Sequence, residues 1–174
     1  MKQKFLAFLF YILPHHAISL LMFKLSRIKW PPLKNLIIRT YTALNPVKMH
    51  EAVEQDMFAY DSLNAFFTRA LTPECRPFDQ DAANWICPVD GSVSQAQAID
   101  NGRIFQAKGQ EYSLLELVGG DEKLEETFRN GQFATLYLSP RDYHRIHMPA
   151  TGTLKHMLYI PGRLFSVATF VVQH

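Results

Sequence analysis

A cluster of titratable side chains lies in residues 138–152, which read LSPRDYHRIHMPATG. Between its two prolines this segment contains two histidines, one aspartate and two arginines: Arg141, Asp142, His144, Arg145 and His147. Imidazole is the side chain best suited to proton transfer near neutral pH. The segment is therefore either a polar surface turn or the functional part of a site.

The spacing of the two histidines predicts that their rings point in different directions. The surrounding pattern of short apolar runs and turn dipeptides predicts a strand over 143–148. In a strand His147 shares a face with Tyr143 and Arg145, whereas His144 lies on the other face. This spacing argues against a metal site built on the two histidines.

A carboxylate that could act with a histidine occurs earlier, in the sequence Pro88-Val89-Asp90-Gly91. Glycine permits backbone conformations that other residues resist, so the simplest interpretation is a hairpin turn. Beside a histidine, however, Asp90 supplies the group that orients a general base. An aspartate that accepts a hydrogen bond from one imidazole nitrogen fixes the tautomer and leaves the other nitrogen free to deprotonate a nucleophile.

The composition describes a chain large enough to position such a site. With 174 residues, 48% of them hydrophobic and 20% charged, it fits one ordinary folded domain with an appendage. The formal net charge of +2 is too balanced to indicate nucleic acid as a partner. Cys75 and Cys87 form no CxxC pair and no metal-ligand spacing, which predicts reduced thiols.

The N-terminal region is basic and apolar, and the first acidic residue is Glu51. Its basic residues are Lys2, Lys4, Lys24, Arg27, Lys29, Lys34, Arg39 and Lys48. The pattern predicts helices over 5–13, 17–29 and 33–44, broken at prolines. The first apolar run is far shorter than the about 20 residues that span a bilayer. Helices that lie on the membrane surface are therefore predicted, with a helical subdomain packed on the core as the alternative.

The predicted fold class is α+β, with N-terminal amphipathic helices followed by a β-rich, barrel- or sandwich-like domain that is incomplete here. Three regions are expected: a membrane-associating helical region over 1–48, a helical linker region over 49–84, and the N-terminal part of a β-rich catalytic domain over 85–174. Further helices are predicted over 60–71, 113–118 and 122–128, and further strands over 133–138, 152–160 and 164–172.

Several motifs resemble those of the bacterial phosphatidylserine decarboxylase proenzymes. They are SLNAFFTRAL (62–71), ECRPFD (74–79), PVDGSVS (88–94), QAKGQEYSL (106–114), FRNGQF (128–133), YLSPRDYHRIHMPATG (137–152) and YIPGRLFSV (159–167). The resemblance runs in order from about Tyr60 to Val167 and is highly specific.

The resemblance implies a reaction and a role for each site residue. In that family a serine in a Leu-Gly-Ser-Thr-like motif attacks its preceding peptide bond, and the chain splits into a β subunit and an α subunit that begins with a pyruvoyl group. By analogy Asp90 orients His147, and His147 deprotonates the serine. His144 then binds the substrate carboxylate region or supplies a proton during conversion of phosphatidylserine to phosphatidylethanolamine and CO2. The pyruvoyl group is the electron sink.

The resemblance also implies partners and a location. The expected partners are phosphatidylserine and anionic membrane lipids, a pyruvoyl-bearing α subunit, and a second copy in a homodimer. No nucleic acid and no metal are expected. The expected location is peripheral, on the cytoplasmic face of the bacterial inner membrane.

The sequence departs from the family because it contains no Leu-Gly-Ser-Thr motif, and the resemblance also weakens after Val167, where the chain reads ATFVVQH. Ser139 precedes a proline and Ser166 lies in LFSV, so neither has the required context. A truncated β-chain portion, inactive alone and unable to form pyruvoyl, is therefore expected. A non-catalytic lipid-binding or scaffold protein is one alternative. A metal-dependent hydrolase using Asp90, Asp142, His144 and His147 is another, which the spacing disfavours.

Overall fold

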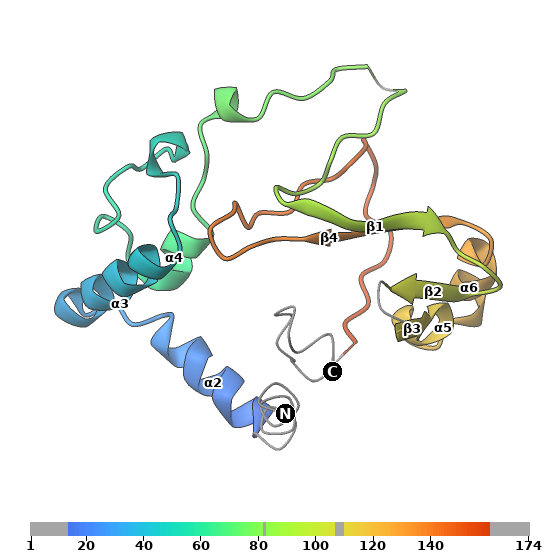
Figure 1. Cartoon of the computed structure of the whole chain (residues 1–174), viewed down its shortest axis with the longest axis horizontal. Helices are drawn as coiled ribbons and strands as arrows, with labels where there is room; N and C mark the ends of the chain where they lie inside the picture. The colour runs from blue at the N-terminus through green and yellow to red at the C-terminus, as the bar shows by residue number, and fades with distance from the viewer. Residues whose placement is uncertain (1–13, 82, 107–109, 161–174) are drawn as a thin grey trace, which may run out of the picture. The chain divides into compact units, whose positions relative to one another are not determined.

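The computed structural model describes residues 14–81, 83–106 and 110–160 (Figure 1). The chain divides into two compact units, one of residues 27–157 and one that combines Met1–Ser26 with Leu158–His174. The predicted helix over 5–13 and the predicted strand over 164–172 lie outside the described residues. The predicted division into three regions stays a prediction.

Helix α2 (His15–Leu25) belongs to the smaller unit and starts directly after Pro14. The predicted helix over 17–29 is confirmed over most of its length, but it ends at Leu25. No residue of α2 is buried, and four consecutive large apolar side chains are more than half exposed: Leu20, Leu21, Met22 and Phe23. Among the described residues, no helix is both long and apolar enough to cross a bilayer.

The larger unit begins with two helices that pack on each other, α3 (Pro31–Leu44) and α4 (Leu63–Phe67). Pro31 and Pro32 occupy the first turn of α3, where their missing N–H groups cost nothing. Ile38 of α3 and Phe66 of α4 are completely buried. Tyr41 packs edge-on against Phe66, with the ring centroids 6.2 Å apart.

The predicted helix over 60–71 is much too long, since α4 covers only five residues. The Ser62 hydroxyl accepts a hydrogen bond from the Ala65 N–H and so fixes the start of α4. After α4 the chain pairs with an earlier segment instead of continuing the helix. The Val53 N–H donates to the Ala70 carbonyl, and the Thr72 N–H donates to the Glu51 carbonyl. Short 3-10 helices over Met49–Glu51 and Pro73–Cys75 flank this pairing.

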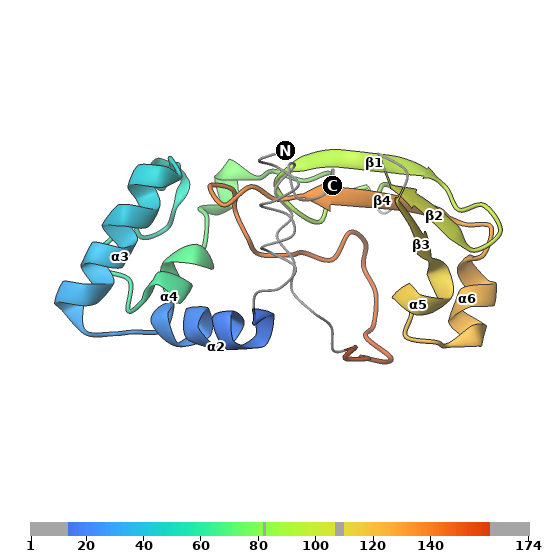
Figure 2. The same cartoon turned by 60° about the horizontal axis from the view of Figure 1, so that its bottom comes forward.

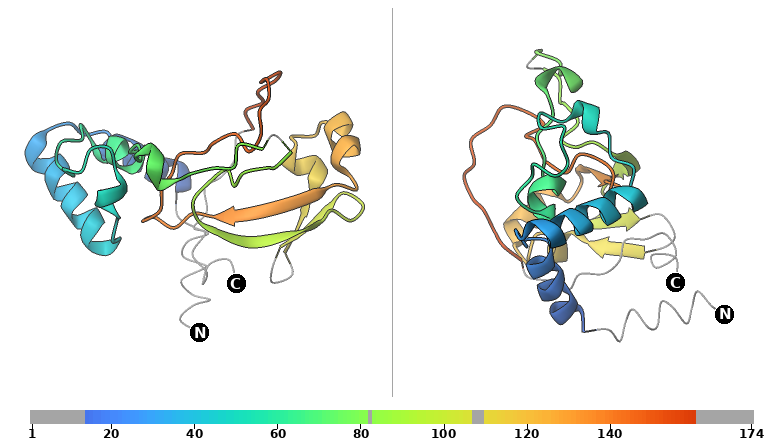
Figure 3. Two further views of the ribbon diagram at one scale, coloured as in Figure 1. Left: turned by 90° about the horizontal axis from the view of Figure 1, so that it is seen from above. Right: turned by 90° about the vertical axis from the view of Figure 1, so that its left-hand side faces the viewer.

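The longer sheet consists of β1 (Ser92–Ala98) and β4 (Gln132–Tyr137), which run antiparallel (Figure 3). Ser92 lies opposite Tyr137, and the register shifts between Val93 and Gln95. The predicted strand over 133–138 is confirmed with a shift of one residue.

The residues between these strands form a small separate core. It contains β2 (Arg103–Gln106), β3 (Gln110–Ser113), α5 (Leu114–Leu117) and α6 (Glu122–Phe128), which lie together in Figure 2. Ile99, Ile104 and Leu114 are buried, and Val118 and Phe133 pack on them. The predicted helices over 113–118 and 122–128 are both confirmed. The turn before β2 uses Asn101 and Gly102, with φ of 49° and 73°.

The predicted strands over 143–148 and 152–160 are wrong, because neither segment has strand structure. Residues 143–148 make isolated contacts with several different segments, and every residue of 152–160 is exposed. A strand needs a partner for its backbone groups. The α+β class is confirmed: within the described residues the β part comprises two two-stranded sheets, and neither closes into a barrel.

Candidate functional site

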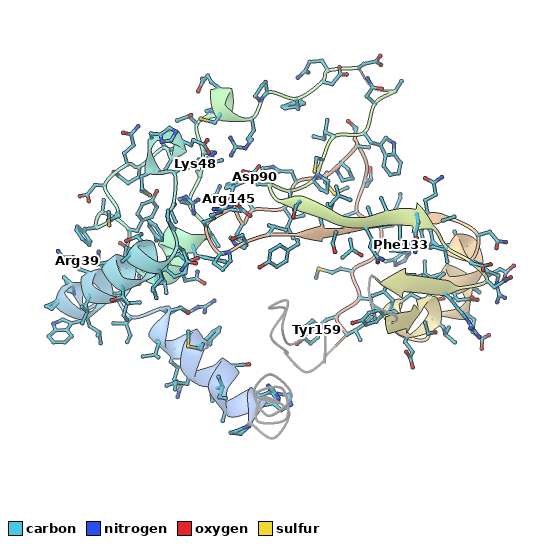
Figure 4. The ribbon with its side chains drawn as sticks, viewed as in Figure 1. Arg39, Lys48, Asp90, Phe133, Arg145 and Tyr159 are labelled. Atoms are coloured by element: carbon cyan, nitrogen blue, oxygen red, sulfur yellow. The ribbon has the colours of Figure 1, made fainter. Side chains whose placement is uncertain are left out.

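Two backbone hydrogen bonds bring the histidine segment beside the Asp90 turn. The His147 N–H donates to the Pro88 carbonyl at 2.8 Å, and the Ile86 N–H donates to the Pro149 carbonyl at 3.0 Å. His147 is therefore hydrogen-bonded to Pro88, which lies only two positions before Asp90 in the chain. Figure 4 labels Asp90 and Arg145, which lie at the end of the β1–β4 pair nearest to α4.

The Asp90 carboxylate is bound by Arg76. The Arg76 Nε donates to both carboxylate oxygens at 2.8 and 3.0 Å, and its Nη2 donates to Oδ2 at 2.5 Å. The same Nη2 also donates to Glu51 at 2.8 Å. These hydrogen bonds from Arg76 lower the pKa values of Asp90 and Glu51, and they raise the pKa of Arg76 itself. The aspartate is therefore ionised at neutral pH.

His147 is paired with Tyr143. The Tyr143 hydroxyl lies 2.9 Å from His147 Nε2, and the two rings stack with their centroids 5.6 Å apart. Tyr143 is 8% exposed, whereas His147 is exposed. A buried phenol thus holds an imidazole that solvent can reach. Since Asp90 contacts Arg76 and His147 contacts Tyr143, the predicted contact between Asp90 and His147 is not made in this conformation and stays a prediction.

His144 occupies a different environment. Its ring stacks on Phe67 with the centroids 4.0 Å apart, and its Nε2 lies 3.0 Å from the Ser139 carbonyl oxygen. A carbonyl can only accept, so Nε2 carries a proton and Nδ1 is the basic nitrogen of the neutral ring. Burial lowers the pKa of His144, and the bond to Ser139 partly opposes this effect. The two histidines contact different groups, as their spacing predicts.

The loop before His144 is a tight turn supported by Arg69. The Ser139 N–H donates to Asp142 Oδ2 at 2.7 Å, and the Asp142 N–H donates to the Ser139 carbonyl at 2.8 Å. Nη2 of the buried Arg69 lies 3.4 Å from the carbonyl oxygens of Arg141 and Asp142. The Asp142 carboxylate therefore stabilises the turn by accepting the hydrogen bond from the Ser139 N–H.

The thiols and possible metal ligands lie apart from one another. Cys75 and Cys87 are free thiols; Cys75 lies beside the Thr72 hydroxyl and Cys87 beside the Val89 carbonyl. Within residues 14–81, 83–106 and 110–160, no three histidine, cysteine, aspartate or glutamate side chains gather as metal ligands would.

Sequence reasoning missed three residues of this site: Arg76, Arg69 and Phe67. Arg76 lies in ECRPFD, which was identified as a motif but given no role. Arg69 lies in SLNAFFTRAL, between the apolar residues 65–67 and 70–71, and a charge in such a place is a signal of a special environment. Phe67 is indistinguishable in sequence from an ordinary core aromatic residue. The site is thus an acid–base arrangement on an α+β chain, with one exposed and one partly buried histidine.

Comparisons with known proteins assign this chain to a family. The sequence model described as phosphatidylserine decarboxylase matches residues 63–174, and a second model described as PSD matches residues 5–43. The first match covers α4, β1–β4 and the whole histidine segment. The chain belongs to the phosphatidylserine decarboxylase family, a family of lyases.

Three similar proteins are each named phosphatidylserine decarboxylase proenzyme. The protein of Alkalilimnicola ehrlichii is 54% identical over 167 residues, which cover 96% of this chain and 58% of that protein. The Bordetella pertussis protein is 52% identical over 157 residues, covering 90% of this chain and 53% of that protein. The Pseudomonas putida protein is 49% identical over 167 residues, covering 96% and 58%. The chain thus spans little more than half the length of these relatives.

Proposed function

We propose that this chain supplies the acid–base part of a phosphatidylserine decarboxylase, which converts phosphatidylserine to phosphatidylethanolamine and CO2. The observation that carries the proposal is the separation of the two histidines. One imidazole is exposed and bound by a phenol, and the other is stacked and bound by a carbonyl. Two proton-transfer groups in different environments suit a protein that performs two reactions, processing of its own chain and decarboxylation.

His147 is proposed as the base for processing. Its Nε2 already lies within hydrogen-bond distance of one hydroxyl group, that of Tyr143, so a serine hydroxyl could bind there in the same way. Asp90 would then accept a hydrogen bond from the Nδ1–H of His147 and so fix the tautomer. For this the Asp90 carboxylate must exchange its bonds from Arg76 to His147, whose backbone N–H donates to the carbonyl of Pro88, two residues before Asp90.

His144 is proposed to act in decarboxylation. Its Nε2 proton is committed to the Ser139 carbonyl, which leaves Nδ1 for the substrate. The burial that lowers its pKa keeps the ring neutral near neutral pH, so it takes up a proton only when an anionic group is close. Such a ring can stabilise a bound carboxylate or return a proton to the carbon that has lost CO2.

The family implies a pyruvoyl group made from a serine, and the residues present suit it. The supporting observation is the exposed imidazole of His147 beside a hydroxyl, since serine activation needs an accessible base. When formed, the group would supply the electron sink for loss of CO2. Asp90 and His147 would face it, on an α subunit that pairs with this chain. The proenzyme names of the relatives support such a two-chain form, and a homodimer of it is part of the proposal.

Membrane contact is proposed through the N-terminal region. Four large apolar side chains of α2 are exposed in succession, and the basic residue Lys24 lies in the last turn of the same helix. Each basic residue near an anionic leaflet contributes about 1 kcal/mol of attraction. This arrangement favours a peripheral protein on the cytoplasmic face of the bacterial inner membrane.

The test of the proposed reaction uses this chain joined to a segment that carries the Leu-Gly-Ser-Thr motif of the family. The joined protein should release labelled CO2 from carboxyl-labelled phosphatidylserine, and a carbonyl reagent should abolish the release. Residues 1–174 alone should release none, because positioned histidines contribute only about 10²–10⁴-fold and supply no electron sink. Turnover by residues 1–174 alone, or none by a correctly processed joined protein, would overturn the proposal.

A further inference from the structure

Three consecutive residues at the end of α4 contact the loop that carries His144. The Phe67 ring stacks on the His144 imidazole. The Thr68 carbonyl accepts a hydrogen bond from Arg145 Nε at 2.8 Å. The Arg69 Nη2 lies 3.4 Å from two carbonyl oxygens of the loop. Contacts therefore reach the loop before His144, the histidine itself, and the residue after it.

We propose that Phe67 and Arg69 are positioning residues for His144, with Phe67 fixing the plane of the imidazole ring and Arg69 fixing the backbone turn that binds its Nε2. The inference deepens the proposed function and rests on it, because it concerns the histidine assigned to decarboxylation. It assigns a role in the site to α4, a helix that sequence analysis treated as part of a linker.

Phe67 is itself held in place, which makes it a suitable support. The Tyr41 ring of α3 packs edge-on against it, with the centroids 6.2 Å apart and the planes at 84°. The Tyr41 hydroxyl donates to the Pro140 carbonyl, inside the same loop. The stack with Phe67 has an interplanar angle of 24° and limits rotation of the His144 ring. The restricted ring keeps its Nε2 directed at Ser139, so Nδ1 keeps one direction too.

Arg69 is unusual because its charge is buried with few partners. The residue is 3% exposed, and its Nε and Nη1 have no hydrogen-bond partner. Burying a guanidinium in this way is unfavourable, and burial lowers the pKa of Arg69. What the side chain contributes is the contact of Nη2 with the carbonyl oxygens of Arg141 and Asp142, supported by its position over the Phe66 ring. These carbonyls belong to the turn whose Ser139 carbonyl holds His144.

The direct test is the state of the His144 ring, measured by long-range ¹H–¹⁵N NMR on residues 1–174. The unmodified chain should show a single Nε2–H tautomer. Phe67→Leu and Arg69→Met should give a mixture of tautomers, whereas Phe67→Tyr should keep the single form because it keeps the stack. Phe78→Leu and Arg39→Met are the matched controls, since both residues are exposed and neither contacts His144. A single tautomer in both Phe67→Leu and Arg69→Met would overturn the proposal.

Kinetics of the joined protein give the second readout. Phe67→Leu should process itself normally but decarboxylate about 10–100-fold more slowly in kcat, with KM little changed, because only the orientation of a reacting group is lost. Equal losses of processing and decarboxylation would show a merely structural role and overturn the proposal. Failure of the proposed function looks different: His144→Ala would then retain full turnover, while the tautomer result would still report whether Phe67 and Arg69 fix the ring.

Discussion

The Asp90 carboxylate is bound by Arg76, and a second possible partner, His147, is bonded to the same turn. Arg76 binds both of its oxygens and links it to Glu51. His147, bonded through its backbone to Pro88, is the partner that self-processing would need. Charge-assisted bonds of this kind are stronger than neutral ones, so Arg76 holds the carboxylate in place and also competes for it. At the scale of single residues, Arg76 therefore governs where the Asp90 charge lies.

Removing Arg76 should change the pH dependence of stability. Arg76 lowers the pKa values of Asp90 and Glu51 in the folded chain, so the stability it provides is present above their ordinary values and is lost as pH falls through the lowered ones. Arg76→Met should lower the free energy of unfolding at pH 7 by about 1 kcal/mol, a modest figure because solvent screens the pair. The difference should vanish as the pH falls below the lowered pKa values of the two carboxylates, on the acid side of their ordinary values.

Thermal unfolding of residues 1–174 at a series of pH values measures this effect. Lys29→Met is the control, because Lys29 and Asp61 form an ion pair whose side chains are both 75% exposed. It should change stability by only a few tenths of a kcal/mol at any pH, or about zero. If the plots of unfolding free energy against pH for Arg76→Met and the unmodified chain stay parallel down to low pH, the bonds from Arg76 to the two carboxylates do not stabilise the fold.

At the scale of elements, the entry into β1 depends on Gly91. Its φ of 142° is a conformation that residues with a side chain rarely adopt, and a Cβ here would collide with the Tyr137 carbonyl oxygen of β4. The close approach lets the turn that carries Asp90 join the β1–β4 pair. Glycine is the residue that allows this contact.

Gly91→Ala should lower the free energy of unfolding by about 3 kcal/mol, because it combines backbone strain with a steric collision. Gly120→Ala is the matched control: its φ is also positive, at 84°, but no atom lies within 4 Å of the added Cβ. That variant should lose only about 1 kcal/mol, from strain alone. Chemical denaturation of both variants measures the difference, and equal losses would show that the collision with Tyr137 does not matter.

Local signals predicted some elements well and could not predict others. The helix over Glu122–Phe128 has its predicted bounds because the Asp121 side chain accepts hydrogen bonds from the Lys123 and Leu124 N–H groups. An aspartate directly before a helix is a signal that the local sequence shows. The strand predicted over 143–148 failed because its residues bind Pro88, Thr68 and Phe67, all distant in sequence. The histidines and Asp90 could be selected by residue type and resemblance. Their present partners Arg76, Tyr143 and Phe67 depend on tertiary contacts that no local pattern encodes.

At the scale of the whole molecule, the division into two units defines which residues can be removed. Helix α3 belongs to the unit of residues 27–157, where Lys34 and Ile38 are buried and Tyr41 supports the loop at Pro140. Deleting residues through α3 would therefore damage the site. Deleting residues 1–26 removes α2 with its exposed apolar side chains and leaves the larger unit intact.

The deletion of residues 1–26 should release the protein from anionic vesicles. Intact protein should cosediment with vesicles that contain phosphatidylglycerol, and raised salt should weaken this binding, because screening reduces the attraction of exposed basic residues. Vesicles of phosphatidylcholine are the control for charge. Equal binding by the intact and shortened proteins would contradict a membrane role for the N-terminal region.

The division of labour between His147 and His144 is the central claim, and one measurement on the joined protein tests it most directly. The masses of the chains formed by His147→Ala and His144→Ala show whether each variant has processed itself, and CO2 release from labelled phosphatidylserine follows in the same samples. His147→Ala should remain a single uncut chain. His144→Ala should be cut like the unmodified protein but should decarboxylate about 10²–10⁴-fold more slowly. If both variants stop at the same step, or if His147→Ala is cut at the normal rate, the assignment of the two histidines is contradicted.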